Sequence, residues 1–403
     1  MRILVLNSGS SSIKFSLYDS EDAVATPDLI FDGQLSGIGG TSAHLHLQHA
    51  DSSGPPEDLT VQANKLETAI QLVMNAITKH TTSPPEAVGY RVVHPGPNLH
   101  AHQKITPEVL DELDRSATFA PLHDPEAVML IRSGMKHLPH ATHFACFDTI
   151  FHQTMPEEAT TYPLPPDLRQ QGIRRYGFHG LSCESIVRQM RQQHTLPKRM
   201  VIAHLGSGCS VTALLDGCSI DTTMGLTPTG GVIMGTRSGD LDPGLVLYLM
   251  RQQQGDRDKA ISAVEALLNH ASGMVSLSGM ENDVKAMRAA ANEGNAQARL
   301  ALSVFTRSIT KAIGAFCWLF GGLDCIVFSG GIGEHDSQTR ADILQNLSGL
   351  GVILENFTQH SSSVSIQRIS SDLSKVEVLI VPAEEDLMIA LHVNQMVRSE
   401  TPF

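Results

Sequence analysis

The hydrophobic residues of this chain fall into short runs and into longer stretches with helical spacing. Ile3–Leu6 is a short apolar run, and Ile13–Tyr18 alternates apolar with polar residues, as a strand with one buried face does. Small residues at Asn7–Ser12 separate the two segments and predict a turn. The N-terminal segment is therefore expected to form a β-hairpin with a small-residue tip.

Further segments predict strands that alternate with helices. Strands are expected at Ala87–Val93, His143–Phe147, Cys325–Phe328 and Val376–Val381, and helices at Leu66–His80, Thr106–Ala117 and Leu300–Phe320. This alternation predicts an α/β fold. The weakest pattern lies in Gly37–Pro56 and in the tail after Val393, which are expected to be irregular.

The hairpin pattern recurs near residue 200. Val201–His204 and Val211–Leu215 are apolar, and Gly206–Ser210 between them is another small-residue turn. Moving Leu4–Asp19 by 198 positions, from 4 to 202, places it on Ile202–Gly217. A repeat separated by about half of the chain favours a duplicated domain. Two unrelated hairpins are the other interpretation of the same pattern.

Length, charge and cysteine usage limit the class of protein. The chain has 403 residues, enough for two domains, and a net charge of −13. An acidic surface argues against nucleic acid or an anionic membrane as a partner. Ala312–Leu323 is too short to span a bilayer, and Met1–Leu6 is too short for a signal sequence. The six cysteines form no CxxC pair, which favours a reducing cytoplasm.

Three small-residue turns each follow a predicted strand, at Asn7–Ser12, Gly206–Ser210 and Ser329–Gly333. Glycine and serine let backbone N–H groups approach an anionic ligand closely, which is how phosphate sites are built. Lys14 follows the first turn, where its ammonium could balance phosphate charge. None of the turns has Walker or Rossmann spacing, but three in one chain favour a nucleotide site.

Charged and imidazole side chains gather at strand ends and in glycine-rich loops. Arg91 and Asp148 come at the ends of predicted strands, Arg237 lies in M-G-T-R-S-G-D, His179 in R-R-Y-G-F-H-G, and His123 in P-L-H-D-P. Alone, each is interpreted as a surface charge, a helix cap or a hydrogen-bonded loop histidine. Together they suit phosphoryl transfer, which needs several positive donors around the moving group.

A histidine cluster, H-L-H-L-Q-H, contains His44, His46 and His49. On a strand, His44 and His46 would share one face. No carboxylate or cysteine accompanies them at ligand spacing, so the cluster is interpreted as a solvated strand face and not as a metal site.

Seven motifs occur in chain order and resemble those of the acetate and propionate kinases. They are L-N-S-G-S-S-S-I-K-F at 6–15, G-Y-R-V-V-H at 89–94, P-L-H-D-P at 121–125, F-D-T-I-F-H-Q-T-M-P at 147–156, R-R-Y-G-F-H-G at 174–180, M-G-T-R-S-G-D-L-D-P at 234–243 and G-G-I-G-E at 330–334. The matches extend from residue 3 to about residue 392, nearly the whole chain. Seven ordered motifs make the resemblance highly specific.

The resemblance implies a fold shared with sugar kinases, actin and the ATP-hydrolysing heat-shock chaperones. Two duplicated actin-like (ribonuclease H-like) α/β domains, each around a five-stranded sheet, would enclose an interdomain active-site cleft. The first domain would span 1–150 and be completed by 386–403. The second, 151–385, would bind nucleotide and join two copies into a homodimer.

The resemblance also implies roles at the reacting centre. Arg91 would hold the substrate carboxylate, and Asp148 would lie at the active centre, where it would orient Arg91 or a metal-bound water. His179 and Arg237 would stabilise the phosphoryl group in flight, with His123 nearby.

A metal site and a nucleotide site follow from the same resemblance. Asn7 and Glu385 would handle Mg²⁺, with Mn²⁺ as an alternative ion and Glu384 as the rival ligand. Contacts to ATP or ADP would come from Ser10, Ser12, Lys14, His204, Leu205, Gly206, Ser207, Gly208, Asp283, Val284, Lys285, Gly331, Ile332, Gly333, Glu334 and His335. Ser207, Lys285 and Glu384 stand where the family has asparagine, arginine and asparagine.

The implied reaction is the reversible, direct in-line transfer of a phosphoryl group from ATP to acetate, giving acetyl phosphate and ADP. The acyl group would meet an apolar pocket formed by Val93, Leu122, Phe178 and Pro228. A propionate kinase of the same family is the alternative. A non-catalytic nucleotide-binding switch of the superfamily is a further one.

Overall fold

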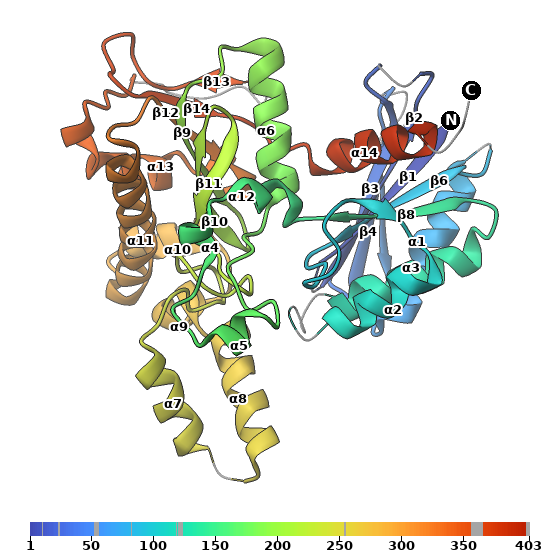
Figure 1. Ribbon diagram of the computed structural model, residues 1–403, viewed down its shortest axis with the longest axis horizontal. Helices are drawn as coiled ribbons and strands as arrows, with labels where there is room; N and C mark the ends of the chain where they lie inside the picture. Colours follow the sequence, from blue (N-terminus) through green and yellow to red (C-terminus); the bar gives the residue numbers. More distant parts are fainter. Residues whose placement is uncertain are drawn as a thin grey trace. The chain divides into compact units, whose positions relative to one another are not determined.

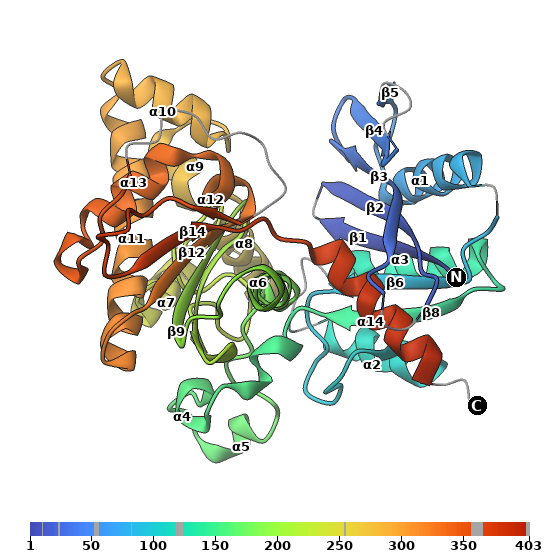
Figure 2. The same ribbon diagram turned by 90° about the horizontal axis from the view of Figure 1, so that it is seen from above.

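The chain forms two α/β units, each built on a mixed β-sheet (Figures 1 and 2). A computed structural model describes residues 1–9, 11–22, 25–51, 56–81, 83–117, 119, 124–253, 255–355 and 366–399. The first unit comprises Met1–Ile150 with Glu384–Phe403, and the second comprises Phe151–Ala383. The predicted α/β fold class is confirmed.

The first unit contains an eight-stranded sheet in the order β5-β4-β3-β2-β1-β6-β8-β7. Its strands are β1 (Arg2–Gly9), β2 (Ser12–Asp19), β3 (Asp28–Ser36), β4 (Ala43–His49), β5 (Glu57–Val61), β6 (Ala87–Val92), β7 (Gln103–Lys104) and β8 (Thr142–Phe147). Its helices are α1 (Leu66–His80), α2 (Pro107–Ser116), α3 (Asp124–His137) and α14 (Glu385–Ser399). Because β1, β6 and β8 are parallel, their carboxyl ends meet at one edge of the sheet.

Helix α14 returns to the first unit from the C-terminal part of the chain and packs on β1 and β6 (Figure 1). Gly89 of β6 permits this packing. A Cβ atom at Gly89 would lie 2.5 Å from Cγ2 of Ile389 and 2.8 Å from Cγ2 of Val393, closer than real contacts allow. The missing side chain therefore lets the first turn of α14 reach the sheet edge where β1, β6 and β8 end.

The second unit contains a six-stranded sheet in the order β11-β10-β9-β12-β14-β13. Its strands are β9 (Arg199–Leu205), β10 (Cys209–Leu215), β11 (Cys218–Thr222), β12 (Cys325–Ser329), β13 (Gln367–Arg368) and β14 (Glu377–Ile380). Its helices are α4 (Glu157–Thr160), α5 (Pro166–Arg169), α6 (Gly180–Gln193), α7 (Pro243–Gln252), α8 (Arg257–His270), α9 (Gly273–Ser278), α10 (Val284–Asn292), α11 (Ala296–Phe320), α12 (Gly330–His335) and α13 (Ser337–Gln345). Two 3₁₀ turns, η1 (Ile150–Thr154) and η2 (Ser348–Leu350), complete the regular elements of the described residues.

The two sheets repeat one arrangement. In β3-β2-β1-β6-β8 and in β11-β10-β9-β12-β14, two antiparallel pairings are followed by two parallel ones. The expected five-stranded sheets are thus only the shared cores, because β4, β5 and β7 extend the first sheet and β13 extends the second. The shared order favours duplication over two unrelated hairpins.

The hairpin tips are shorter than the sequence pattern predicts. Asn7 belongs to β1 and pairs with Lys14 of β2, and Gly9 pairs with Ser12, so both strands of the first hairpin extend into the predicted turn. In the second hairpin Leu205 pairs with Cys209, which leaves three residues at the tip. These small residues adopt strand geometry because the neighbouring strand provides hydrogen-bond partners for their backbone groups.

Other boundaries also differ from the predictions. The stretch Gly37–Pro56 contains β4, and the predicted turn Ser329–Gly333 gives way to α12 after Ser329. Helix α14 runs to Ser399, so the tail remains regular well past Val393. The predicted helices Leu66–His80 and Thr106–Ala117 are confirmed as α1 and α2, and Thr106 caps α2 as expected.

Helix α11 is the core helix of the second unit. It starts at Ala296, earlier than predicted, because the Asn295 side chain accepts hydrogen bonds from the first turn, and it ends at Gly321 with φ of 68°. It packs against α9, α10 and α13. Among the described residues it is the one helix long and apolar enough to cross a membrane, and 44% of the apolar window lies buried inside the protein.

The histidines of β4 are not a uniformly solvated face. His44 is exposed, but His46 lies 2.7 Å from Asp58, and His49 Nε2 lies 3.1 Å from His80 Nδ1. His80 in turn contacts Glu57. Side chains of the neighbouring strand and helix therefore provide hydrogen-bond partners for the His46 and His49 rings.

Candidate active site

Four predicted residues of the first unit meet at the carboxyl ends of β1, β6 and β8. The Arg91 guanidinium donates two hydrogen bonds to the Asp148 carboxylate, one of them from Nε to Oδ1 at 3.1 Å. Its Nη1 donates to Asn7 Oδ1 at 3.3 Å, and Glu385 Oε2 lies 3.8 Å from Nε. The arginine is thereby held in one orientation by a bidentate ion pair.

Local structure explains why these side chains meet. Arg91 is near the end of β6, and Asp148 directly follows β8, where its N–H still bonds to the Val92 carbonyl at 3.2 Å. Asn7 is in the adjacent β1, and Glu385 opens α14. Parallel strands with aligned ends, together with the close approach of α14, gather the four.

The arrangement contains more carboxylates than cations. Asp386, which the sequence analysis did not single out, accepts a hydrogen bond from Ser16 Oγ at 2.7 Å and also bonds to Asn7. Burial raises the pKa of Asp386, and burial likewise raises the pKa of Asp148, against the opposing effect of Arg91. An amide oxygen and carboxylates around a buried edge form the all-oxygen donor set that suits Mg²⁺ or Mn²⁺.

Asp124 is a second buried acid that sequence reasoning missed. It opens α3, is 1% exposed, and its Oδ1 accepts a hydrogen bond from the His94 N–H at 3.2 Å. Its Oδ2 has no hydrogen-bond partner among the described residues. Burial, with a smaller contribution from Asp148, raises the pKa of Asp124 to about 8. The carboxyl group is therefore protonated at neutral pH and anchors the segment that follows β6.

The remaining predicted residues of this unit have different surroundings. Val93 is buried just after β6, Ser12 is partly buried in β2, and the Lys14 side chain is exposed opposite Asn7. Three predicted residues, Ser10, Leu122 and His123, lie outside the described residues.

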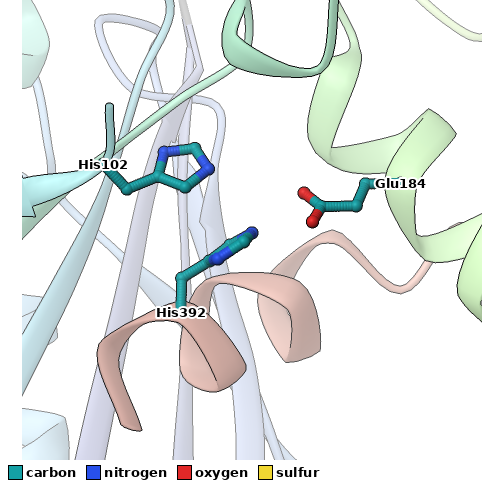
Figure 3. A group of neighbouring side chains, drawn as sticks. All are labelled: His102, Glu184 and His392. Atoms are coloured by element: carbon teal, nitrogen blue, oxygen red, sulfur yellow. The ribbon is translucent and has the colours of Figure 1, made fainter. Parts of the chain in front are cut away.

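A pair of histidines also supports β8. His102 Nδ1 accepts a hydrogen bond from the Phe147 N–H at 3.0 Å, and its ring centroid lies 4.1 Å from that of His392 (Figure 3). Burial, followed by His392, lowers the pKa of His102 to about 3, which keeps the ring neutral and able to accept. Glu184, also drawn in Figure 3, belongs to the second unit.

In the second unit, His179 is held in an unusual backbone conformation. Its φ of 57° is in the left-handed region, which costs a non-glycine residue about 1–2 kcal/mol. His179 Nδ1 lies 3.0 Å from Ser210 Oγ, and its ring stacks on that of His204, with centroids 4.3 Å apart. His204 Nδ1 lies 2.7 Å from Ser182 Oγ. Backbone strain at a fixed imidazole is typical of a functional position.

His152 supports this conformation from beneath. Its Nε2 donates to the Phe178 carbonyl at 2.9 Å, and its Nδ1 lies 2.9 Å from Ser219 Oγ. Burial lowers the pKa of His152 to about 4, so the ring stays neutral. Gly177, with φ of 77°, packs so closely on it that a Cβ there would lie 2.8 Å from the ring. His152 lies in the F-D-T-I-F-H motif. Its supporting role could not be predicted from the sequence, because its partners Phe178 and Ser219 are distant in the chain.

Arg237 and His179 converge on the tip of the β9–β10 hairpin. A Cβ atom at Gly208 would lie 3.3 Å from Arg237 Nη1 and 3.3 Å from His179 Nε2. Arg237 Nη1 also donates to the carbonyl of Pro228 at 3.1 Å, and Pro228 itself is buried. The glycine tip therefore leaves room beside two side chains that can donate to an anion.

The backbone of the Arg237 loop is fixed by neighbouring elements. The Ser238 N–H bonds to the Leu268 carbonyl of α8 at 3.0 Å, and the Ser272 N–H bonds to the Thr236 carbonyl at 3.0 Å. Phe178, predicted for the acyl pocket, is 1% exposed and lies one residue before His179. The two backbone hydrogen bonds at Ser238 and Thr236 make the glycine-rich loop of Arg237 a rigid support.

The β12–α12 connection is also tightly built. Gly330, with φ of 75°, approaches the end of β9 so closely that a Cβ would lie 2.7 Å from the Leu205 carbonyl oxygen. Glu334 Oε1 accepts from the Gly330 N–H at 2.8 Å and from the Ala383 N–H at 3.4 Å. The Glu334 carboxylate thus serves the protein backbone. Arg340, buried beside it, donates to the carbonyls of Gly333 and Glu334.

The other predicted nucleotide contacts are more exposed. The Asp283 side chain caps α10 by accepting from the Ala286 N–H at 3.0 Å, and Lys285 is exposed in the first turn. Exposure is uneven over the remaining positions: Ser207, Gly331 and His335 are exposed, Val284, Ile332, His204, Gly206 and Gly208 are partly buried, and Leu205 and Gly333 are buried.

Residues 2–391 match the Acetokinase family. The chain belongs to this family. An acetate kinase of Rhodopseudomonas palustris is 39% identical over 397 residues, covering 97% of each chain. A propionate kinase of Citrobacter rodentium is 37% identical over 409 residues, covering 100% of this chain and 98% of the relative. The predicted membership of this phosphotransferase family is confirmed.

This chain is also similar to a solved structure. A propionate kinase from Francisella tularensis aligns with a TM-score of 0.86 at 31% identity, covering 98% of this chain and 99% of that one. The chain is thus a phosphotransferase of a family that uses ATP and Mg²⁺. Relatives named for acetate and for propionate are similarly distant, so the family alone leaves the acyl substrate open.

Proposed function

We propose that this chain is an acetate kinase, which reversibly transfers a phosphoryl group from ATP to acetate by direct in-line transfer. The observation that best supports the proposal is the Arg91–Asp148 pair, which holds a guanidinium ready for a carboxylate. Because Asp148 is committed to Arg91, it acts by orientation. The acetate oxygen itself is the nucleophile, so no protein base is required.

His179 and Arg237 are the residues proposed to stabilise the transferred phosphoryl group. Both side chains are fixed beside Gly208, His179 by Ser210 and Arg237 by the Pro228 carbonyl. Charge builds on the phosphoryl oxygens during transfer, and preorganised donors stabilise it without reorganising. The strained backbone of His179 is consistent with this role.

The proposed metal position is the oxygen-rich edge of the first unit. Asn7 and Glu385 would hold Mg²⁺ or Mn²⁺. Asp386 would orient Asn7 through the hydrogen bond between them. The ion would supply charge neutralisation for the phosphate oxygens. The rival assignment to Glu384 is less well supported, because Glu385 is the carboxylate beside Arg91.

Propionate kinase is the second candidate function. The names of the Citrobacter and Francisella relatives favour it. Val93 is buried and apolar within the first unit, and Phe178 and Pro228 are buried and apolar within the second. An apolar pocket discriminates by only about 1–3 kcal/mol per methylene, so propionate is expected to be a poorer but measurable substrate.

A homodimer in the cytoplasm is proposed as the working form. Helix α7 has no buried residue, although its sequence is largely apolar. Leu247 and Tyr248 are 53% and 55% exposed, and Ile261 of the adjacent α8 is 40% exposed. Apolar faces of this kind are normally covered by a partner. The dimeric kinases that the sequence resembles make a second copy of this chain the proposed occupant.

The reaction type can be tested by trapping the acyl phosphate as a hydroxamate. With ATP, Mg²⁺ and acetate, the enzyme should form hydroxamate, and chelation of the metal should stop it. Pyrophosphate in place of ATP should support slower synthesis at equal concentration. Faster synthesis with pyrophosphate would reject ATP as the donor, and no product with either donor would reject the proposed reaction.

A further inference from the structure

Helices α10, α11 and α13 belong to the second unit (Figures 1 and 2), and residues of all three line a groove. Its volume is about 800 Å³, the size of a small-molecule site. Helix α11 contacts both α10 and α13. None of the groove residues belongs to the predicted catalytic or nucleotide-binding set.

The groove is strongly cationic in an acidic protein. Four of its lining residues are cationic and one is a carboxylate: Arg288, Arg299, Arg307, Lys311 and Asp342. The net charge of the whole chain is −13, so a local excess of positive charge is not a consequence of composition. Such a patch attracts anions at short range.

The acidic lining residue is already neutralised. Arg288 Nη1 donates to Asp342 Oδ2 at 2.8 Å, and its Nη2 contacts Asp336 and the Thr339 hydroxyl. Asp342 Oδ1 also accepts from Gln338 Nε2 at 2.9 Å. This network joins α10 to α13 and makes one wall of the groove rigid.

The charged groups of Arg307 and Lys311 on α11 are available to bind a ligand. Within the described part of the chain, Arg307 and Lys311 have neither an ion pair nor a hydrogen bond, and Arg299 donates to the Gly294 carbonyl. Arg307 and Lys311 are spaced by one helical turn, about 6 Å, and like charges at this spacing repel each other. An anion between them would relieve that repulsion.

Polar groups around these cations complete a binding site. Ser303 of α11 lines the groove with a hydroxyl that can donate to an anion, whereas the hydroxyls of Thr306 and Thr310 donate to helix carbonyls. Gln345 and Asn346 line the groove with side-chain amides. We propose that this groove binds a small polyanion, phosphorylated or polycarboxylic, with Arg307 and Lys311 as the main charge partners. An arginine fork and an ammonium together suit phosphate or carboxylate groups spaced by a few ångströms.

The test is calorimetric titration of the full-length protein, without nucleotide or metal, using tripolyphosphate and propane-1,2,3-tricarboxylate as separate probes. The Arg307→Gln/Lys311→Gln double variant keeps part of each aliphatic stem and removes two charges. It should weaken binding of the accepted probe at least tenfold. The probe that binds decides between a phosphorylated and a carboxylic ligand.

Two controls separate the groove from general charge and from the catalytic site. Lys65→Gln/Lys136→Gln removes two exposed charges from the first unit and should leave binding unchanged. Arg237→Ala weakens the proposed phosphoryl site, so the binding that persists in this variant belongs to the groove. Equal affinity of the parent and the groove variant, loss of binding in Arg237→Ala, or no binding of either probe at millimolar concentration would each overturn the proposal.

Discussion

At the residue scale, Arg237 is the side chain whose loss should most reduce turnover. Its guanidinium is fixed beside Gly208 and close to His179, where it can donate to a phosphoryl oxygen. Arg237→Ala should lower kcat by about 10³-fold, the magnitude associated with losing a cationic donor in phosphoryl transfer. Arg191→Ala, at an exposed position of α6, is the matched control. A kcat of Arg237→Ala within tenfold of the parent would exclude this role.

Asp124 should make stability depend on pH. Its pKa of about 8 in the folded state compares with about 3.9 in an unfolded chain. The folded protein therefore keeps a proton that the unfolded chain releases. The stabilising contribution is complete below about pH 4 and is lost as the pH rises through about 8, with a slope of up to about 1.4 kcal/mol per pH unit.

Asp124→Asn should remove this dependence, because an amide keeps the acceptor for His94 and cannot ionise. Its free energy of unfolding should exceed that of the parent at pH 8 and approach it at pH 4.5. Arg91 and Asp148 also face this carboxyl group, so the difference between the two proteins is the quantity to measure by denaturant unfolding. Parallel curves for the two proteins would mean that Asp124 does not titrate in this range.

Which site residues could be predicted depended on their local context. Arg91 and Asp148 were recognisable because they stand near the carboxyl ends of apolar strands, where ligands bind in α/β sheets. Asp124 and His152 were not, since an acid before a helix and a histidine in a loop both have ordinary explanations. Their burial and partners depend on segments distant in sequence, which single-residue patterns do not encode.

At the element scale, the position of α14 depends on Gly89. Gly89→Ala should push the helix away from β6, because its Cβ would meet Ile389 and Val393 at 2.5 and 2.8 Å. Overpacking of this kind costs about 1–3 kcal/mol. Since α14 begins with Glu385, the apparent KM for Mg²⁺ should also rise.

Gly314→Ala in α11 is the matched control, because nothing lies within 4 Å of a Cβ there. It should be neutral or stabilise the protein by about 0.5–1 kcal/mol, as alanine does in a helix interior. Thermal unfolding and Mg²⁺ titration of both variants make the comparison. An unchanged Tm for Gly89→Ala would show that α14 can shift without loss.

Elements with strong local signals were predicted closely, and those defined by partners were not. Helix α1 spans the predicted Leu66–His80 because its apolar spacing, with Ile70 and Ile77 buried, is self-sufficient. Strand β4 was considered only as the segment that carries His44 and His46, within a stretch expected to be irregular, because that stretch is polar and glycine-rich and β4 is defined by pairing with β3 and β5. Helix α12 was predicted as a turn because three of its six residues are glycine.

At the scale of the whole molecule, the internal repeat was visible in the sequence because each hairpin kept its pattern of apolar strands and small-residue tip. The same pattern did not predict strands β4, β5, β7 and β13, which extend the sheets beyond the repeated core. Strands β5, β7 and β13 lie at sheet edges, where pairing needs only one neighbour and sequence constraints are weaker, and β4 joins β5 to the shared core.

The proposed dimer predicts a concentration-dependent assembly through α7. Leu247→Glu/Tyr248→Glu should give monomers in sedimentation equilibrium, because charge on an apolar contact surface disfavours its burial. Met129→Glu, at a 38% exposed position of α3, is the control and should leave the dimer intact. A monomeric parent, or a double variant that stays dimeric, would contradict the proposed surface.

The most direct test of the account compares kcat/KM for acetate, propionate and butyrate in the same hydroxamate assay. An acetate kinase with a small apolar pocket should prefer acetate, use propionate about 10–200-fold less well, and hardly use butyrate. Val93→Ala should shift the ratio toward propionate if Val93 contacts the acyl group. A parent enzyme with higher kcat/KM for propionate than for acetate would contradict the acetate assignment and establish the propionate alternative.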